Sequence, residues 1–480
     1  MTIDLKNLTV EKTQEHFKNG DFTVRDLVNA YLETIKEKNT DINAYLEVFE
    51  VEEQIKKADA MLKDGTATPM TGIPISIKDN MLMEGHIASA SSNMLSNYTA
   101  TYDSFVVKSL RDAGAIILGR TNMDEFAMGS SNETSAFGIT KNPVNTEYVP
   151  GGSSGGPAAS VAMDGALCAL GSDTGGSIRQ PAAFCGLVGL KPTYGTVSRN
   201  GIISMASSFD QVGPITKTVR DTEILFNAIN GYDKNDATST PTEQRLDLGF
   251  SRGTTSALKK RIGVPREFLK GDGIVPQVLE NFEKSCESLE NAGYEIVDVS
   301  LPLIKYSLAV YYIIQPAEVS SNLARYDGIR YGHHEDGKDL LSVYTQSRGH
   351  GFGKEVRRRI ILGTYILSHG YYDAYYNASV LVRKGIRKEL MNVFEGVDAI
   401  ITPTSPFPPF KFGAKSNDPI AMYMSDLFLA PANIAGTPAI SIPSGTNSDG
   451  LPLGLQIMAP FLREDILFTI GKDFENSIKN

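Results

Sequence analysis

At 480 residues the chain is long enough for one large domain or two smaller ones, and its 41% apolar and 21% charged residues are ordinary for a globular protein. The net charge of -10 argues against direct binding to a nucleic-acid backbone, which requires clustered Lys and Arg. The three cysteines, Cys168, Cys185 and Cys286, form no CxxC pair, so a thiolate zinc site is not expected.

Nothing in the sequence marks the protein for export or for a membrane. The start of the chain lacks the basic segment and following apolar segment of a secretory signal. No apolar run reaches the roughly 20 residues that are needed to cross a bilayer. We therefore expect a cytoplasmic protein with reduced thiols and no membrane contact.

The first half of the chain predicts alternating helices and strands. Residues 10–65 are expected to be helical, and Thr23 and Asp26 have the spacing of a capping box. A short β-branched segment then alternates up to Lys78, which is typical of a strand. The elements expected next are a helix at 105–113, a strand at 115–119, a helix at 158–163, a strand at 165–170, a connection at 209–214 and a helix at 218–230.

The second half resumes this alternation after a polar segment, residues 238–260, that has little periodicity and is expected to be a linker. Strands are expected at 262–264, 294–301, 399–402, 439–442 and 455–458, and helices at 275–292, 308–326, 354–394 and 463–479. The whole pattern predicts an α/β fold, a single large α/β/α domain with a central mixed β-sheet.

Two loops rich in glycine and serine stand out in this pattern. Residues 151–156 read GGSSGG, and residues 171–177 read GSDTGGS. Glycine lets the backbone approach a ligand closely, and serine supplies a hydroxyl. Because only the apolar stretch 161–170 lies nearby in sequence, we expect backbone N–H groups and nucleophilic oxygens to be gathered at one place.

Several common motifs with such residues fit poorly. Neither loop has the pattern of a Walker loop or of a dinucleotide-binding loop, so nucleotide binding is a minor alternative. Residues 151–155 match the letters of an α/β-hydrolase nucleophile elbow, but a polar loop with proline precedes them, and no histidine has a triad context. Ser256 and Lys259 have Ser-x-x-Lys spacing, but they lie in the linker-like segment, and we interpret the match as chance.

Three segments taken together resemble the amidase signature family. They are the strand end at Lys78, the loop around Ser153 and the segment DTGGSIRQPA that contains Ser177, and the intervals between them agree with that family. The resemblance implies that Ser177 is the nucleophile, that Ser153 relays a proton and that Lys78 is the base. A serine hydroxyl needs such a base, and burial favours the neutral lysine that can act as one.

The resemblance also implies an oxyanion hole in the second loop. Its donors would be the backbone N–H groups of Thr174, Gly175, Gly176 and Ser177. The chain departs from the family at Pro157, where a small residue such as serine is more usual. This proline follows the Ser153 loop, and we expect it to be tolerated in the first turn of the next helix.

Much of the second half resembles the A-subunit family of tRNA-dependent glutamine amidotransferases. The segments that carry the resemblance are 311–314, 320–331, 351–359, 370–376 and 422–426. It implies that Tyr311, Arg359 and Asp426 hold the substrate glutamine. An arginine suits the α-carboxylate and an aspartate suits the α-ammonium, whereas the other two arginines of 357–359 are expected on a solvated helix face.

The resemblance further implies a heterotrimer with subunits B and C. Ammonia from glutamine would pass to a partner that uses ATP and magnesium to amidate Glu-tRNA(Gln), Asp-tRNA(Asn) or both. The partner would also make most of the tRNA contacts, and no cofactor or metal is expected in this chain. The alternatives are a stand-alone amidase that acts on small amides and a scaffold protein without catalytic activity.

These considerations divide the single domain into four parts. Residues 1–65 form an N-terminal helical part, and residues 66–235 form the catalytic core. Residues 236–260 are a linker-like excursion, and residues 261–480 are expected to recognise the substrate and to complete the sheet.

Overall fold

The computed structural model describes residues 3–241, 258–416 and 418–478. Most of the predicted linker, with Ser256, therefore lies outside the described residues. The strands are β1 Tyr45–Val48, β2 Pro74–Lys78, β3 Ile116–Thr121, β4 Cys168–Asp173, β5 Val188–Lys191, β6 Gln211–Thr216, β7 Arg261–Val264, β8 Glu295–Asp298, β9 Ala399–Pro403, β10 Ala439–Thr446 and β11 Pro452–Met458.

The helices lie between these strands in sequence. They are α1 Val10–Asn19, α2 Val24–Ile42, α3 Glu52–Lys63, α4 Phe105–Asp112, α5 Gly155–Ala162, α6 Arg179–Phe184, α7 Val219–Ile229, α9 Pro276–Asn291, α10 Ser307–Asn322, α11 Leu340–Gly351, α12 Lys354–Ile366, α13 Ala378–Phe394, α14 Pro419–Tyr423, α15 Ala430–Ala435 and α16 Glu464–Ser477. None of the helices in the described ranges combines the length and the apolar character that crossing a membrane requires.

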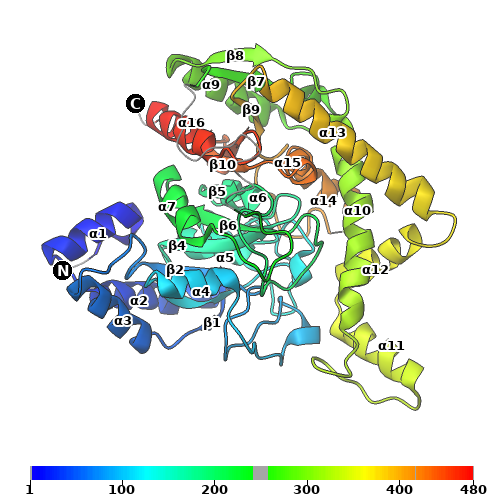
Figure 1. The fold of residues 1–480 in the computed structure, drawn as a ribbon, viewed down its shortest axis with the longest axis horizontal. Coiled ribbons are helices and arrows are strands. Elements are labelled where there is room, and N and C mark those ends of the chain that lie inside the picture. Colours follow the sequence, from blue (N-terminus) through cyan, green and yellow to red (C-terminus); the bar gives the residue numbers. More distant parts are fainter. Residues whose placement is uncertain (1–2, 242–257, 417, 479–480) are drawn as a thin grey trace.

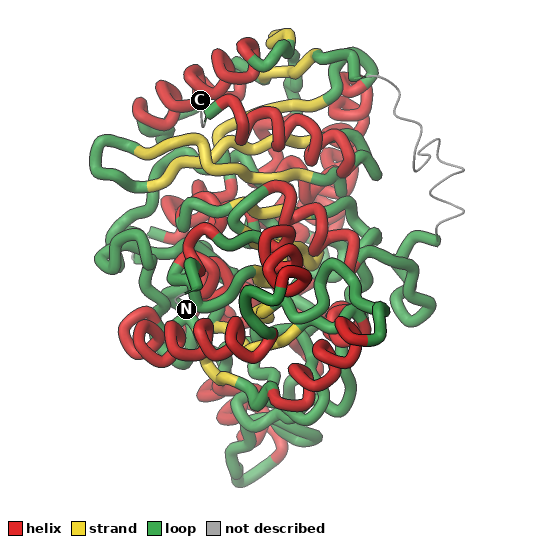
Figure 2. The backbone as a smooth tube through the Cα atoms, turned by 90° about the vertical axis from the view of Figure 1, so that its left-hand side faces the viewer, coloured by secondary structure: helices red, strands yellow, loops and turns green. Residues whose placement is uncertain are grey.

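One mixed sheet contains all of these strands, in the order β1-β3-β2-β4-β6-β5-β10-β11-β9-β7-β8. Pairing is parallel around β2 and around β7, and it is antiparallel through the middle of the sheet. Strands run from the top to the bottom of the molecule in Figure 2, with helices around them. The prediction of a single large α/β/α domain with a central mixed sheet is confirmed.

A group of helices at one side of the molecule carries the residues expected to recognise the substrate. Figure 1 shows α10, α11, α12 and α13 together along this side, away from α1 to α3. The helices α10 and α12 pack very closely, because a Cβ atom on Gly363 would collide with the carbonyl of Pro316. This close packing fixes the position of α12 relative to α10.

Local sequence explains several of the element boundaries. Thr23 and Asp26 form the predicted capping box at the start of α2, with the Thr23 side chain accepting from the Asp26 N–H at 3.1 Å. The helix α5 begins at Gly155, so Pro157 lies in its first turn, where its missing N–H removes no intrahelical bond.

Three expectations about elements were wrong. The strand β1 interrupts the region predicted to be helical, and a break after Ile366 with a π-helix at Tyr372–Asn377 separates α12 from α13. The predicted connection at 209–214 instead contains most of β6, a buried strand between β4 and β5. Gly213 and Pro214 suggest a turn in sequence, but tertiary pairing on both sides overrides that local signal.

Candidate active site

The two loops rich in glycine and serine meet at one edge of the sheet. The strands β2 and β4 are parallel neighbours, so their carboxyl ends, at Lys78 and Asp173, lie at the same edge. The loop before α5 reaches this edge as well, since the Ser154 N–H donates to the Ser177 carbonyl at 3.2 Å. The structure thus brings together Lys78, Ser153 and Ser177 from three separate segments.

Lys78 is completely buried and surrounded by serine oxygens. Its Nζ lies 2.8 Å from Ser153 Oγ, 2.8 Å from Ser154 Oγ and 2.9 Å from Ser172 Oγ. Burial lowers the pKa of Lys78 from 10.5 to about 7, against the opposing effect of nearby carboxylates. A neutral amine can donate to two of these oxygens and accept from the third, so this geometry permits a proton to pass from Ser153 to Lys78.

Ser153 and Ser177 differ in their exposure. Ser153 is buried, and the Gly152–Ser153 peptide bond before it is cis. The Gly152 N–H donates to Gln180 Oε1 at 2.9 Å, which ties this loop to α6 just after Ser177. Ser177 is half-buried, and a hydroxyl at this position can therefore be reached by a substrate.

The loop from Thr174 to Ser177 is shaped by Asp173. The Gly176 N–H donates to Asp173 Oδ1 at 2.8 Å, and the Ile178 N–H donates to Asp173 Oδ2 at 3.2 Å. The Thr174 hydroxyl donates to Asp210 at 3.0 Å. In the part of the chain that the structure describes, the N–H groups of Gly175 and Ser177 donate to no protein acceptor, whereas the expected donor Gly176 is already engaged.

A buried ion pair supports this loop from below. Asp173 and Arg179 are both fully buried, and Arg179 Nε lies 3.0 Å from Asp173 Oδ2. Burial alone would raise the pKa of Asp173, but the charge of Arg179 and its hydrogen bonds outweigh burial and lower the pKa to about 2. Arg179 also donates to Gln456 on β11 and to Asn433 on α15, so the loop is tied to the second half of the chain.

Two of the residues expected to bind substrate lie on the facing helices α10 and α12. Tyr311 is buried and lies against the loop, since a Cβ atom on Gly175 would be 2.5 Å from the Tyr311 ring. Arg359 is 4% exposed, whereas Arg357 is exposed and Arg358 is half-buried. The expectation that only one of these three arginines faces inward is confirmed.

The Arg359 guanidinium is held on several sides. Its Nε donates to Glu355 Oε1 at 2.9 Å, and its Nη1 donates to Gln315 Oε1 at 3.1 Å. The rings of Tyr312 and Tyr423 lie 5.5 Å and 5.4 Å from its central carbon, within the range of cation–π attraction. The guanidinium is therefore oriented in advance of any ligand.

Asp426 lies near the same tyrosines, at the end of a short 3₁₀ turn after α14. It accepts from the Tyr312 hydroxyl at 2.7 Å and from the Ser130 hydroxyl at 3.4 Å. Burial raises its pKa to about 7, while the Tyr312 hydrogen bond and the Arg359 charge act in the opposite direction. A cation bound here would favour the charged carboxylate.

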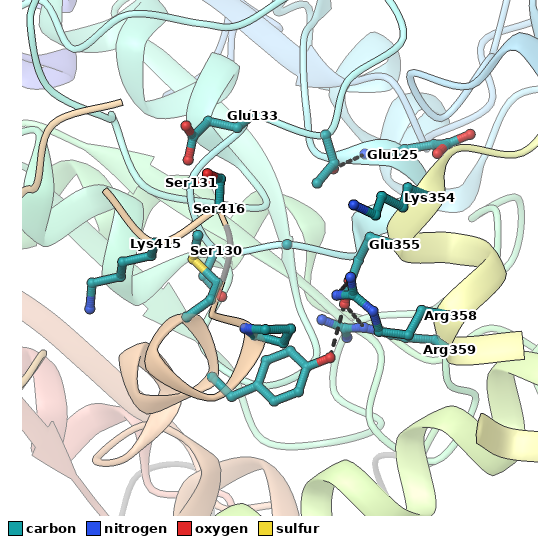
Figure 3. Close-up of a pocket in the computed structure, with 15 residues that line it drawn as sticks. Glu125, Ser130, Ser131, Glu133, Lys354, Glu355, Arg358, Arg359, Lys415 and Ser416 are labelled. Atoms are coloured by element: carbon teal, nitrogen blue, oxygen red, sulfur yellow. Dashed lines mark hydrogen bonds and ion pairs between the residues drawn. The ribbon is translucent and has the colours of Figure 1, made fainter. Parts of the chain in front are cut away.

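A cavity of about 340 Å³ opens beside these residues. Figure 3 shows that Glu355, Arg358 and Arg359 enter it from one helix, while Ser130, Ser131 and Lys415 face it from the other side. Ser130 connects the cavity to the serine loops, because its carbonyl accepts from Gln180 Nε2 at 2.9 Å. The cavity lining includes Arg359 but not Ser177, so it covers the approach to the site rather than the reacting groups.

Sequence reasoning missed several residues of this site. Ser154 and Ser172 contact Lys78, and their positions inside the two glycine-rich loops were the available signal. Gln315, Glu355 and Tyr423 surround Arg359 from three distant parts of the chain, and no local pattern connects them. Within the described ranges, no group of three His, Cys, Asp or Glu side chains is arranged to hold a metal ion.

The fold and the lysine-serine cluster define a hydrolase-like class of α/β protein, and comparison with known proteins specifies the family. The model of the family described as Amidase matches residues 26–468. The chain therefore belongs to the amidase family.

Individual relatives narrow the comparison. The A subunit of glutamyl-tRNA(Gln) amidotransferase from Caldanaerobacter subterraneus subsp. tengcongensis is 50% identical, over 99% of this chain and 98% of the relative. The crystal structure of the protein of the same name from Thermotoga maritima is 41% identical, covers 99% of this chain and 95% of its own, and has a TM-score of 0.80. A solved amidase at 27% identity, with 98% of this chain and 99% of its own covered, has a TM-score of 0.82.

Proposed function

We propose that this chain is the glutamine-hydrolysing A subunit of a tRNA-dependent amidotransferase. Its relatives at 41% to 50% identity carry that name over almost their whole length. The observation that supports the chemistry most directly is the buried Lys78 amine 2.8 Å from Ser153 Oγ, beside the half-buried Ser177. Glutamine suits the nearby pair of opposite charges, Arg359 for the α-carboxylate and Asp426 for the α-ammonium.

In this proposal Ser177 Oγ attacks the side-chain amide carbon of glutamine. Its proton passes to Ser153, whose own proton passes to neutral Lys78. The negative oxygen that forms is stabilised by the loop N–H groups, of which those of Gly175 and Ser177 are unengaged within the described chain. The proton from Lys78 returns through Ser153 to the leaving nitrogen, and ammonia departs from a glutamyl-Ser177 ester.

Water then completes the reaction. With Lys78 neutral again, Ser153 accepts a proton from a water molecule that attacks the ester carbon, and glutamate leaves as the Ser177 oxygen is reprotonated. The sum is hydrolysis of glutamine to glutamate and ammonia. The same groups serve both half-reactions because each step requires the base in one form and regenerates it in the other.

The remaining chemistry belongs, in this proposal, to partner subunits B and C of a heterotrimer. A partner would use ATP and magnesium to activate the carboxylate of Glu-tRNA(Gln), Asp-tRNA(Asn) or both, and ammonia would convert it to the amide. This chain has net charge -10 and neither phosphate-binding motif, which supports placing ATP and most tRNA contacts on a partner.

Co-purification of the tagged chain from its source cells tests the proposal. We expect two partners at one copy each, and ammonia release from glutamine that disappears in the Ser177→Ala variant of the complex. A monomer or homo-oligomer that hydrolyses many small amides would instead indicate a stand-alone amidase. Ammonia release that is unchanged in Ser177→Ala would indicate that this site is not the catalytic one.

A further inference from the structure

Gln315 is a buried side chain whose amide nitrogen has no partner. It lies on α10 and is fully buried. Its Oε1 accepts from Arg359 Nη1 at 3.1 Å, whereas its Nε2 has no hydrogen-bond partner among the residues that the structure describes. Buried polar groups are nearly always hydrogen-bonded, so an unpartnered donor of this kind calls for an explanation.

The contact with Arg359 determines which way the amide faces. A guanidinium has only donors, so the oxygen of Gln315 must face it, and the two N–H groups of Nε2 must face elsewhere. Arg359 is itself immobilised by Glu355 and by the rings of Tyr312 and Tyr423. Gln315 is therefore locked in one orientation by a residue that is already fixed.

The position of Gln315 on α10 places it close to the reacting groups. It follows Tyr311 by four residues, so the two side chains lie on the same face of the helix. The Tyr311 ring lies against Gly175 of the Ser177 loop. Gln315 thus belongs to a continuous set of contacts from Arg359 to the loop that carries the nucleophile.

We propose that Gln315 is a further substrate-binding residue, whose Nε2 donates to the α-carboxylate of the glutamine that Arg359 holds. This inference rests on the function proposed above. A carboxylate has lone pairs for several donors, so it can accept from the arginine fork and from Nε2 together. The ligand would then supply the acceptor that Nε2 lacks in the described protein.

This arrangement gives a reason for selectivity. A substrate that lacks the α-carboxylate leaves Nε2 buried without an acceptor, as it is in the structure, and gains nothing from Gln315. Glutamine satisfies both Arg359 and Gln315. Gln315 should therefore favour amino acid amides over simple amides, without taking part in the bond-making steps.

The test compares two substrates of the assembled complex, glutamine and 4-aminobutanamide, which is glutamine without the α-carboxylate. The decisive readout is the ratio of their kcat/KM values, because a lower fraction of folded enzyme does not alter this ratio. In Gln315→Met we expect the ratio to fall about tenfold, mainly through a higher KM for glutamine. Ser321→Ala, at an exposed position of the same helix, is the matched control and should keep the ratio.

Gln315→Glu provides a second variant of almost the same size. Its carboxylate would pair with Arg359 and repel the substrate carboxylate, so the ratio should fall further than in Gln315→Met. A ratio that stays at the wild-type value in both variants would overturn the proposal, even if both rates drop. Failure of the proposed function is a different result, in which the wild-type complex releases no ammonia from glutamine.

Discussion

Lys78 can act as a base only when it is neutral, and this requirement makes the reaction dependent on pH. Full burial lowers its pKa from 10.5 to about 7. With this pKa, the neutral fraction is about one tenth at pH 6, about one half at pH 7 and about nine tenths at pH 8. We predict that kcat for glutamine hydrolysis rises about fivefold from pH 6 to pH 7, and less than twofold from pH 7 to pH 8.

The corresponding perturbation is Lys78→Met, which keeps the length of the side chain but cannot accept a proton. Loss of a general base typically lowers the rate by a factor of about 10² to 10⁴, and we expect kcat to fall by this amount. The residual rate should no longer show the midpoint near pH 7, because the titrating group has been removed.

The assay is ammonia release from saturating glutamine by the assembled complex, followed from about pH 5.5 to pH 9. Saturation isolates Lys78 from groups that act on substrate binding. Lys191→Met is the matched control, because Lys191 is a second buried lysine with a pKa of about 7, and its Nζ donates to the Pro192 carbonyl rather than to a serine. The control should keep the midpoint near pH 7.

Two results would refute this reasoning. One is a rate that continues to rise with pH up to about 10, since Lys78 would then titrate like a solvated lysine. The other is a Lys78→Met variant with a near wild-type kcat, because the proton from Ser177 would then require a different acceptor.

Three further predictions concern the groups around this base. Asp426 should be protonated below its pKa of about 7, so KM for glutamine should rise as the pH falls from 8 to 6, and Asp426→Asn should have a high KM that no longer varies with pH. Asp173→Asn should leave Arg179 as an unpaired buried charge; calorimetry should then show a loss of stability of about 3–5 kcal/mol, and a normal thermal midpoint would contradict the ion-pair argument. Gly175→Ala would place a methyl group 2.5 Å from Tyr311, so we expect a stability loss of about 1–3 kcal/mol and a lower kcat/KM, whereas an unaltered kcat/KM would mean that the loop and the ring move apart freely.

The buried strand β6 shows why part of the fold could not be predicted from local sequence. Its Gly213–Pro214 pair is typical of a turn, yet both residues lie in a strand between two neighbours. A Cβ atom on Gly213 would collide with the Leu190 carbonyl, so glycine is required by the close approach of two strands. That approach exists only in the folded chain, and residues 209–214 alone do not reveal it.

The reacting groups were predictable because each is defined by its own short segment. The β-branched run that ends at Lys78, and the glycine-rich loops with Ser153 and Ser177, are local patterns with a direct chemical meaning. The capping box of Thr23 and the inward position of Arg359 also follow from spacing within a few residues. The sequence by itself therefore determined the family, the α/β class and the candidate catalytic residues.

Only the tertiary structure decided how these groups are tuned. The pKa of Lys78 depends on complete burial, and the shape of the Ser177 loop depends on Asp173 and on Arg179, which also contacts Gln456 and Asn433 far along the chain. Burial and long-range hydrogen bonds are properties of segments that meet in space. A linear sequence carries no distance between such segments, so it could indicate which residues react but not what environment makes them reactive.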